Sequence, residues 1–191
     1  MEFREMVLKN RSYRGFDESV AISKEELMDL VDLARNTPSA RNLQPLKYHL
    51  SYEKEEVESI LAYTRWAGAL PALHLPKDGQ HPTAFILICN DGQLAADPKA
   101  SSKDVGIVAQ TMLLGAVEKG LGGIMIGAFD QEGVKEYLKI PANLQPQLLI
   151  ALGKPVEEIH LVDMKDGRYN YYRDDAGVHY VPKRSMEEIL F

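Results

Sequence analysis

Apolar residues recur along the chain with two different spacings, and these spacings predict both helices and strands. Spacings of three and four residues are typical of one helix face, whereas alternation or a short apolar run is typical of a strand. Helices are expected over residues 3–9, from Ser23 to no further than Pro38, over 53–63, after Ser101, and between Asp130 and Pro141. Strands are expected over residues 46–52, 83–90, 120–129 and 147–153.

Three helix starts carry capping signals. Ser23 and Glu26 form a capping box, Ser101 and Asp104 repeat its spacing, and Asp130 precedes the short helix. We therefore expect these side chains to bind backbone N–H groups of the first helical turns.

The helix after Ser101 is apolar on nearly every face between Val105 and Val117. A helix of this kind is buried on all sides. In a chain of 191 residues, one way to bury it is against a second copy of itself, so the pattern favours a homodimer.

The chain is expected to form a single domain, residues 1–191, in which residues 154–191 are an extended arm. The arm is charged and rich in tyrosine, and it contains too few apolar residues to fold alone. We expect it to pack on another surface, with a partner subunit as one candidate. The proline-rich connection 64–82 is expected to be a long loop or lid.

Composition argues against several classes of function. The formal net charge of -6 disfavours nucleic-acid binding by bulk electrostatics. No apolar run approaches the roughly 20 residues needed to cross a membrane. Cys89 is the single cysteine, and the N-terminus has no apolar signal core, so a cytoplasmic location is expected. No metal is expected, because the five histidines lack metal-ligand spacing.

Positive charge is nevertheless concentrated near both chain ends. Arg11 and Arg14 flank Ser12, and Lys183 and Arg184 lie near the C-terminus. Arginine pairs and a hydroxyl suit a phosphate, and chain ends are often close in space. The alternative is a solvated charge cluster at the end of a helix.

Two further segments have a composition suited to a flat ligand. The loop 37–45 lies between two prolines and offers Ser39, Arg41, Asn42 and Gln44, which suit the polar edge of a heteroaromatic ring. An ordinary polar connection is the alternative. The segment 120–127 is rich in glycine, but Met125 breaks the dinucleotide-binding pattern, and the segment follows a helix instead of preceding one.

These segments, in this order, resemble the FMN-dependent nitroreductase family. The resemblance rests on "RSYRGF", "PSARNLQP", the aspartate-led helix running into "GLGGIMIGAF", "ALGKP" and "VPKRSMEEIL". It implies an α+β fold, with a mixed, largely antiparallel sheet flanked by helices, in an intertwined homodimer that exchanges C-terminal arms. It also implies FMN as the cofactor and NADH or NADPH as the electron donor.

The resemblance further implies which residues hold FMN. Those implied around the phosphate and the nearby flavin oxygens are Arg11, Ser12, Arg14, Lys183 and Arg184. Those implied to come from the partner subunit are Pro38, Ser39, Ala40 and Asn42, while Met125, Ile126 and Gly127 match the strand along the flavin ring. No catalytic side chain is implied, and Arg14 is expected to tune the flavin.

The implied reaction is a ping-pong reduction of a small electron acceptor, such as a nitroaromatic compound or a quinone. One alternative is a flavin-binding or redox-sensing protein with little turnover. Others are related flavin reactions, reductive dehalogenation or azoline dehydrogenation.

Overall fold

The computed structural model describes residues 1–191, except the side chain of Pro71. The helices are α1 (Phe3–Lys9), α2 (Lys24–Arg35), α3 (Lys54–Ala62), α4 (Ser102–Glu118), α5 (Gln131–Tyr137) and α6 (Met186–Ile189). The strands are β1 (Phe16–Asp17), β2 (Leu46–Ser51), β3 (Ala84–Asp91), β4 (Gly122–Ile126), β5 (Leu144–Pro155), β6 (Ile159–Asp163), β7 (Tyr172–Arg173) and β8 (His179–Lys183). Among the described residues, no helix is both long and apolar enough to cross a membrane.

The main sheet has the order β1-β5-β3-β2, and β4 also pairs with β5. Every strand pair in this sheet is antiparallel. Strands β4 and β1 pair with successive parts of β5, and β3 pairs with the opposite edge of β5. The structure thus confirms the expected α+β fold with a largely antiparallel sheet.

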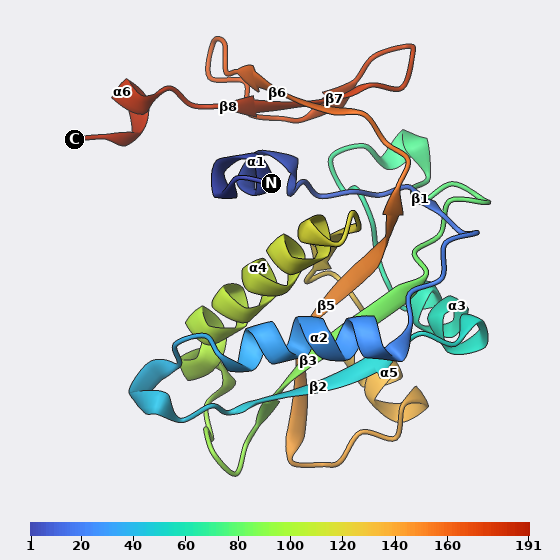
Figure 1. The fold of residues 1–191 in the computed structure, drawn as a ribbon, viewed down its shortest axis with the longest axis vertical. Coiled ribbons are helices and arrows are strands. Elements are labelled where there is room, and N and C mark those ends of the chain that lie inside the picture. Colours follow the sequence, from blue (N-terminus) through green and yellow to red (C-terminus); the bar gives the residue numbers. More distant parts are fainter.

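Alternate residues of β3 enter different hydrophobic cores on the two faces of the sheet. Ile86 and Ile88 pack with α2 and α4 on one face, and Phe85 and Leu87 pack with α3 and α5 on the other. Figure 1 shows α2 and α4 crossing in front of the strands. Cys89 is buried in the second core, and this burial raises the pKa of its thiol to about 12.

Two of the three predicted helix caps are confirmed. Ser23 accepts a hydrogen bond from the backbone N–H of Glu26, and Asp130 accepts one from Gly133. The Ser101–Asp104 prediction is wrong. The Ser101 hydroxyl instead donates to Asn90 Oδ1 in β3, and the Asp104 carboxylate binds residues of a distant loop. Tertiary partners outcompete the local cap at this helix start.

In the single chain, α4 is buried on one side. Val105, Ala109 and Met112 are buried, whereas Gly106 and Gln110 are exposed and Ile107 is 40% exposed. The expected burial on all sides is therefore not achieved within one chain. Burial of the remaining stripe against a second copy stays a prediction.

The C-terminal residues form a separate three-stranded sheet in the order β6-β8-β7. Strands β6 and β8 pair in parallel, which makes the overall strand arrangement mixed. Figure 1 shows this sheet above α1, at one end of the molecule. The residues that follow include the exposed apolar side chains Met186, Ile189, Leu190 and Phe191. Exchange of this arm between subunits stays a prediction.

Adding a methyl group at Gly123 tests how tightly β4 packs on β5. A Cβ there would overlap the carbonyl oxygen of Ala151 and lie 2.9 Å from Leu113 Cδ2 in α4. Gly123→Ala is expected to lower the free energy of unfolding by about 1–3 kcal/mol, as overpacking does. Urea unfolding at fixed protein concentration measures the change.

Gly68→Ala is the matched control, because a Cβ at Gly68 meets nothing within 4 Å. Its effect is expected to stay within about 0.5 kcal/mol. Equal unfolding midpoints for the two variants would contradict the described packing.

Candidate functional site

A cavity of about 280 Å³ lies between the N-terminal segment and the C-terminal sheet. Arg11, Ser12, Arg14 and Lys183 all line it, so the structure brings four of the five predicted phosphate residues together. Arg184 is exposed and is not among the lining residues, and its predicted role is untested.

The main sheet positions the N-terminal segment. Ser12 forms a parallel bridge with Gly123 of β4, and the backbone N–H of Tyr13 donates to the carbonyl of Gly123. Phe16 then pairs with Pro155 at the end of β5. The basic segment 11–14 therefore runs alongside the first residues of β4.

A buried carboxylate joins this segment to the small sheet. The Glu157 side chain is 6% exposed and accepts hydrogen bonds from the backbone N–H of Arg14 and from the guanidinium of Arg173. Because both acceptor oxygens are engaged, Glu157 holds the two sides of the cavity together.

Both arginines of the segment are anchored yet keep an unpartnered donor. Arg14 is 7% exposed, donates from Nη1 to the carbonyl of Ser12, and lies 4.7 Å above the ring centre of Tyr171. Arg11 donates from Nη2 to the carbonyl of Val7. The buried Nε atoms of Arg11 and Arg14 have no hydrogen-bond partner in the described structure. Burial lowers the pKa of both guanidinium groups.

Unpaired buried donors are rare in folded proteins, because each one costs free energy. Two of them, beside a hydroxyl and an ammonium group, suit an oxyanion. The donor set of this cavity therefore fits a phosphate group.

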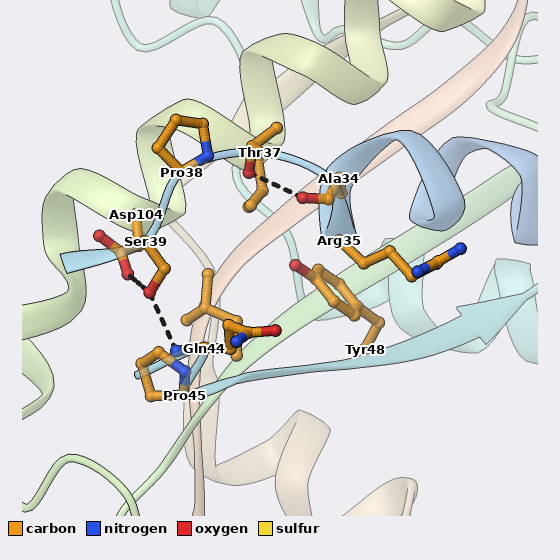
Figure 2. Close-up of a pocket in the computed structure, with 11 residues that line it drawn as sticks. Ala34, Arg35, Thr37, Pro38, Ser39, Gln44, Pro45, Tyr48 and Asp104 are labelled. Atoms are coloured by element: carbon orange, nitrogen blue, oxygen red, sulfur yellow. Dashed lines mark hydrogen bonds between the residues drawn. The ribbon is translucent and has the colours of Figure 1, made fainter. Parts of the chain in front are cut away.

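A second group of predicted residues lies around the N-terminal end of α4. Figure 2 shows Pro38 and Ser39 beside Asp104, at the edge of a cavity of about 170 Å³. The Ser39 hydroxyl donates to Asp104 Oδ2 at 2.6 Å, and the backbone N–H of Ala40 lies 3.2 Å from Oδ1. Asp104 is only 4% exposed, so these hydrogen bonds from the loop replace water as partners of its carboxylate.

The same loop has an unusual backbone. Arg41 and Asn42 have φ of 55° and Gln44 has φ of 49°, all in the left-handed region. Such conformations cost free energy and persist where the surroundings enforce them. Here the backbone N–H of Gln44 donates to Ser39 Oγ, which is itself bound to Asp104. The exposed side chain of Asn42 is thereby displayed from an anchored loop.

The third predicted group follows β4. Met125 is 36% exposed, and Gly127 has open space where a side chain would lie. Ile126 is 4% exposed and packs in the core, so only its backbone is available to a ligand. This group and the basic segment meet along β4, whereas the loop 38–42 is held at the first turn of α4.

A family model described as "Nitroreductase family" matches residues 7–154. The chain belongs to the nitroreductase family. A relative from Methanothermobacter thermautotrophicus, provisionally named NADH dehydrogenase/NAD(P)H nitroreductase, is 29% identical over 87% of this chain and 84% of its own.

Solved structures of the nitroreductase family share the fold. A nitroreductase family protein from Clostridium novyi NT has a TM-score of 0.67 and 27% identity, covering 81% of this chain and 87% of its own. An FMN-dependent nitroreductase from Clostridium difficile R20291 has a TM-score of 0.65 and 22% identity, with 80% and 87% covered.

Three residues in these sites were not identified from the sequence of this nitroreductase-family chain. Asp104 was interpreted as a helix cap, and Glu157 was interpreted as part of a charged arm. His179 lines the basic cavity and is 1% exposed. Only the two-residue period of a strand, which places His179 on the same face of β8 as Lys183, offered a signal for it.

Replacing Asp104 tests whether it sets the conformation of the loop 38–42. Asp104→Ala removes the acceptor for two donors and is expected to lower the free energy of unfolding by about 1–3 kcal/mol. It should also speed trypsin cleavage after Arg41, because the loop loses its anchor. Peptide mapping after limited trypsin digestion measures this local effect.

Asp130→Ala is the control, since Asp130 caps α5 and does not touch the loop. It is expected to cost about 1 kcal/mol and to leave cleavage after Arg41 unchanged. Cleavage of Asp104→Ala at the wild-type rate would show that other contacts hold the loop.

Proposed function

We propose that this chain is an FMN-dependent oxidoreductase that uses NADH or NADPH to reduce small electron acceptors. The observation that carries the proposal is the basic cavity, with the buried, unpartnered Nε atoms of Arg11 and Arg14 beside Ser12 and Lys183. Membership of the nitroreductase family supports a flavin phosphate as the oxyanion.

The proposed FMN site continues from the cavity along β4. Arg11, Ser12 and Lys183 would hold the phosphate, with Arg184 as an outer charge. The backbone at Ile126 and Gly127 would lie along the flavin ring, because the open space at Gly127 permits close approach. Met125 would add an apolar contact from its exposed side chain.

The proposed active form is a homodimer. Pro38, Ser39 and Ala40 line different cavities from the basic segment, and Asn42 lies exposed on the same loop, so a second chain would bring these residues to the flavin. Exposed apolar side chains favour such an interface. They include Ile107 on α4 and Phe3, Val7 and Leu8 on α1. The C-terminal arm is proposed to cross to the partner.

FMN, when bound, would supply the redox chemistry, namely hydride transfer from a nicotinamide and electron transfer to the acceptor. The protein binds and orients the cofactor and provides positive potential. Arg14 suits the last task, because its guanidinium is buried and held by Ser12 and the Tyr171 ring. Charge fixed in a poorly solvated place acts strongly on charge that develops nearby. A ping-pong sequence, in which donor and acceptor use one face in turn, needs no catalytic side chain.

The first test of this function is cofactor binding. The purified protein is expected to bind FMN, and its flavin absorbance is expected to bleach when NADH or NADPH is added without oxygen. Arg11→Ala should weaken FMN binding about ten- to a hundredfold, as loss of a charged hydrogen bond does. Lys183→Ala should weaken it more than Arg184→Ala, because only Lys183 lines the cavity.

Flavin fluorescence titration measures these affinities. A protein that binds no FMN would refute the function. FMN that binds tightly but is not reduced by either nicotinamide would favour a sensing role over turnover.

A mixing experiment tests the shared site. If Arg14 and Asn42 act in one site from different chains, Arg14→Ala and Asn42→Ala dimers each contain two damaged sites. Heterodimers of the two variants contain one intact site and one doubly damaged site. Co-expression with two affinity tags is therefore expected to recover about half of wild-type activity per heterodimer, as independent intact sites would give.

If both residues act from the same chain, every site in the heterodimer carries one damaged residue. Activity would then stay at the level of the single variants, and the proposed sharing would be wrong.

A further inference from the structure

His179 is a buried histidine that lines the basic cavity. It is 1% exposed, and its backbone N–H donates to the carbonyl of Glu158. Its ring packs against Tyr171, with 5.2 Å between ring centres. The buried Nδ1 atom has no hydrogen-bond partner in the described structure. A polar atom buried in this way calls for a partner that the chain does not itself supply.

The charges facing His179 are predominantly positive. Arg14 and Arg173 lie close enough to act on its titration, and Arg11 and Lys183 line the same cavity. The carboxylate of Glu157 is already bound to Arg14 and Arg173. The carboxylate of Glu158 binds His160, whose ring stacks on Tyr180.

Burial, followed by repulsion from Arg14 and Arg173, lowers the pKa of His179 to about 4. The imidazole is therefore neutral at pH 7 in the chain by itself. An anion in the cavity reverses this balance, because a nearby negative charge favours the protonated form of a histidine.

We propose that His179 is a further ligand of the anion in this cavity, and that it takes up a proton when the anion binds. The proton comes from solvent, and Nδ1–H then donates to an anion oxygen as a charge-assisted hydrogen bond. With FMN as the anion the proposal rests on the proposed function, but the donor set serves any phosphate monoester.

The sign of the pH dependence follows from the two pKa values of His179. The free value is about 4, and the value with anion bound is higher. Between the two, the bound state holds one more proton than the free state, so affinity falls as pH rises. Proton linkage limits this fall to about tenfold per pH unit, and affinity is constant above the bound pKa.

The test compares FMN dissociation from holoprotein at pH 6, 7 and 8 for wild type and His179→Asn. Asparagine keeps a neutral donor near the position of Nδ1 but cannot be protonated. The ratio of the variant's dissociation constant to that of wild type is expected to be at least threefold larger at pH 6 than at pH 8. The second pKa of the phosphate is about 6. Its titration affects both proteins alike, so its effect cancels in the ratio of dissociation constants.

His160→Asn is the matched control, because His160 sits on the same small sheet but stacks on Tyr180 outside the cavity. Its ratio is expected to stay near one at every pH. Riboflavin lacks the phosphate. For riboflavin, the ratio of the dissociation constant of His179→Asn to that of wild type should therefore be the same at every pH. A His179→Asn ratio that is the same at all three pH values would overturn the proposal.

A second measurement keeps this result separate from the proposed function and from any folding defect of the variant. In wild-type protein freed of flavin, or found to bind none, NMR follows the imidazole of His179 with and without inorganic phosphate. A pKa that rises by a unit or more with phosphate supports the proposal even if FMN does not bind. An unchanged pKa overturns it, whatever FMN does.

Discussion

Strand β5 pairs with three other strands, and two parts of the candidate flavin site, β4 and the basic segment 11–14, are attached to it directly or through β4 and β1. Its residues Leu149 to Leu152 are fully buried between the two cores. Its outer edge holds β4, which carries Met125, and then β1, which ends the basic segment. Directly after β5 comes Glu157, which binds Arg14 and Arg173. A shift of β5 would therefore move together the strand proposed to lie along the flavin ring and the residues proposed to bind the phosphate.

Buried charge shapes the cavity that β5 supports. Arg14, Arg173 and Glu157 are each largely removed from water, and burying charge is costly unless partners compensate. Glu157 compensates for part of it, but the positive charges in and around the cavity outnumber the carboxylates that face them. A bound oxyanion would complete the compensation, which explains why the site suits a phosphate.

The loop 38–42 also compensates for a buried charge, but here the charge is negative. Asp104 is a buried carboxylate that is satisfied by Ser39 and Ala40, and the loop adopts left-handed conformations around that anchor. Helix α4 carries both Asp104 and the exposed residues that are proposed to meet a second chain. Loop geometry and the proposed subunit interface are thus coupled through one helix, so a second chain would meet both features at once.

The sequence by itself determined helices α1 to α5, strands β2 to β5 and the local chemistry, whereas β1 and the strands of the C-terminal sheet were not predicted. Helical spacing, strand runs and the caps at Ser23 and Asp130 depend on neighbours within a few residues, so periodicity and capping patterns predicted them. The pairing of Arg11 and Arg14 around Ser12 was visible for the same reason. The tertiary structure decided what lies far apart in the chain: Ser39 and Asp104 are 65 residues apart, and Arg14 and Glu157 are 143 apart. No local pattern encodes such contacts, because a carboxylate near a helix start looks the same whether it caps that helix or binds a distant loop.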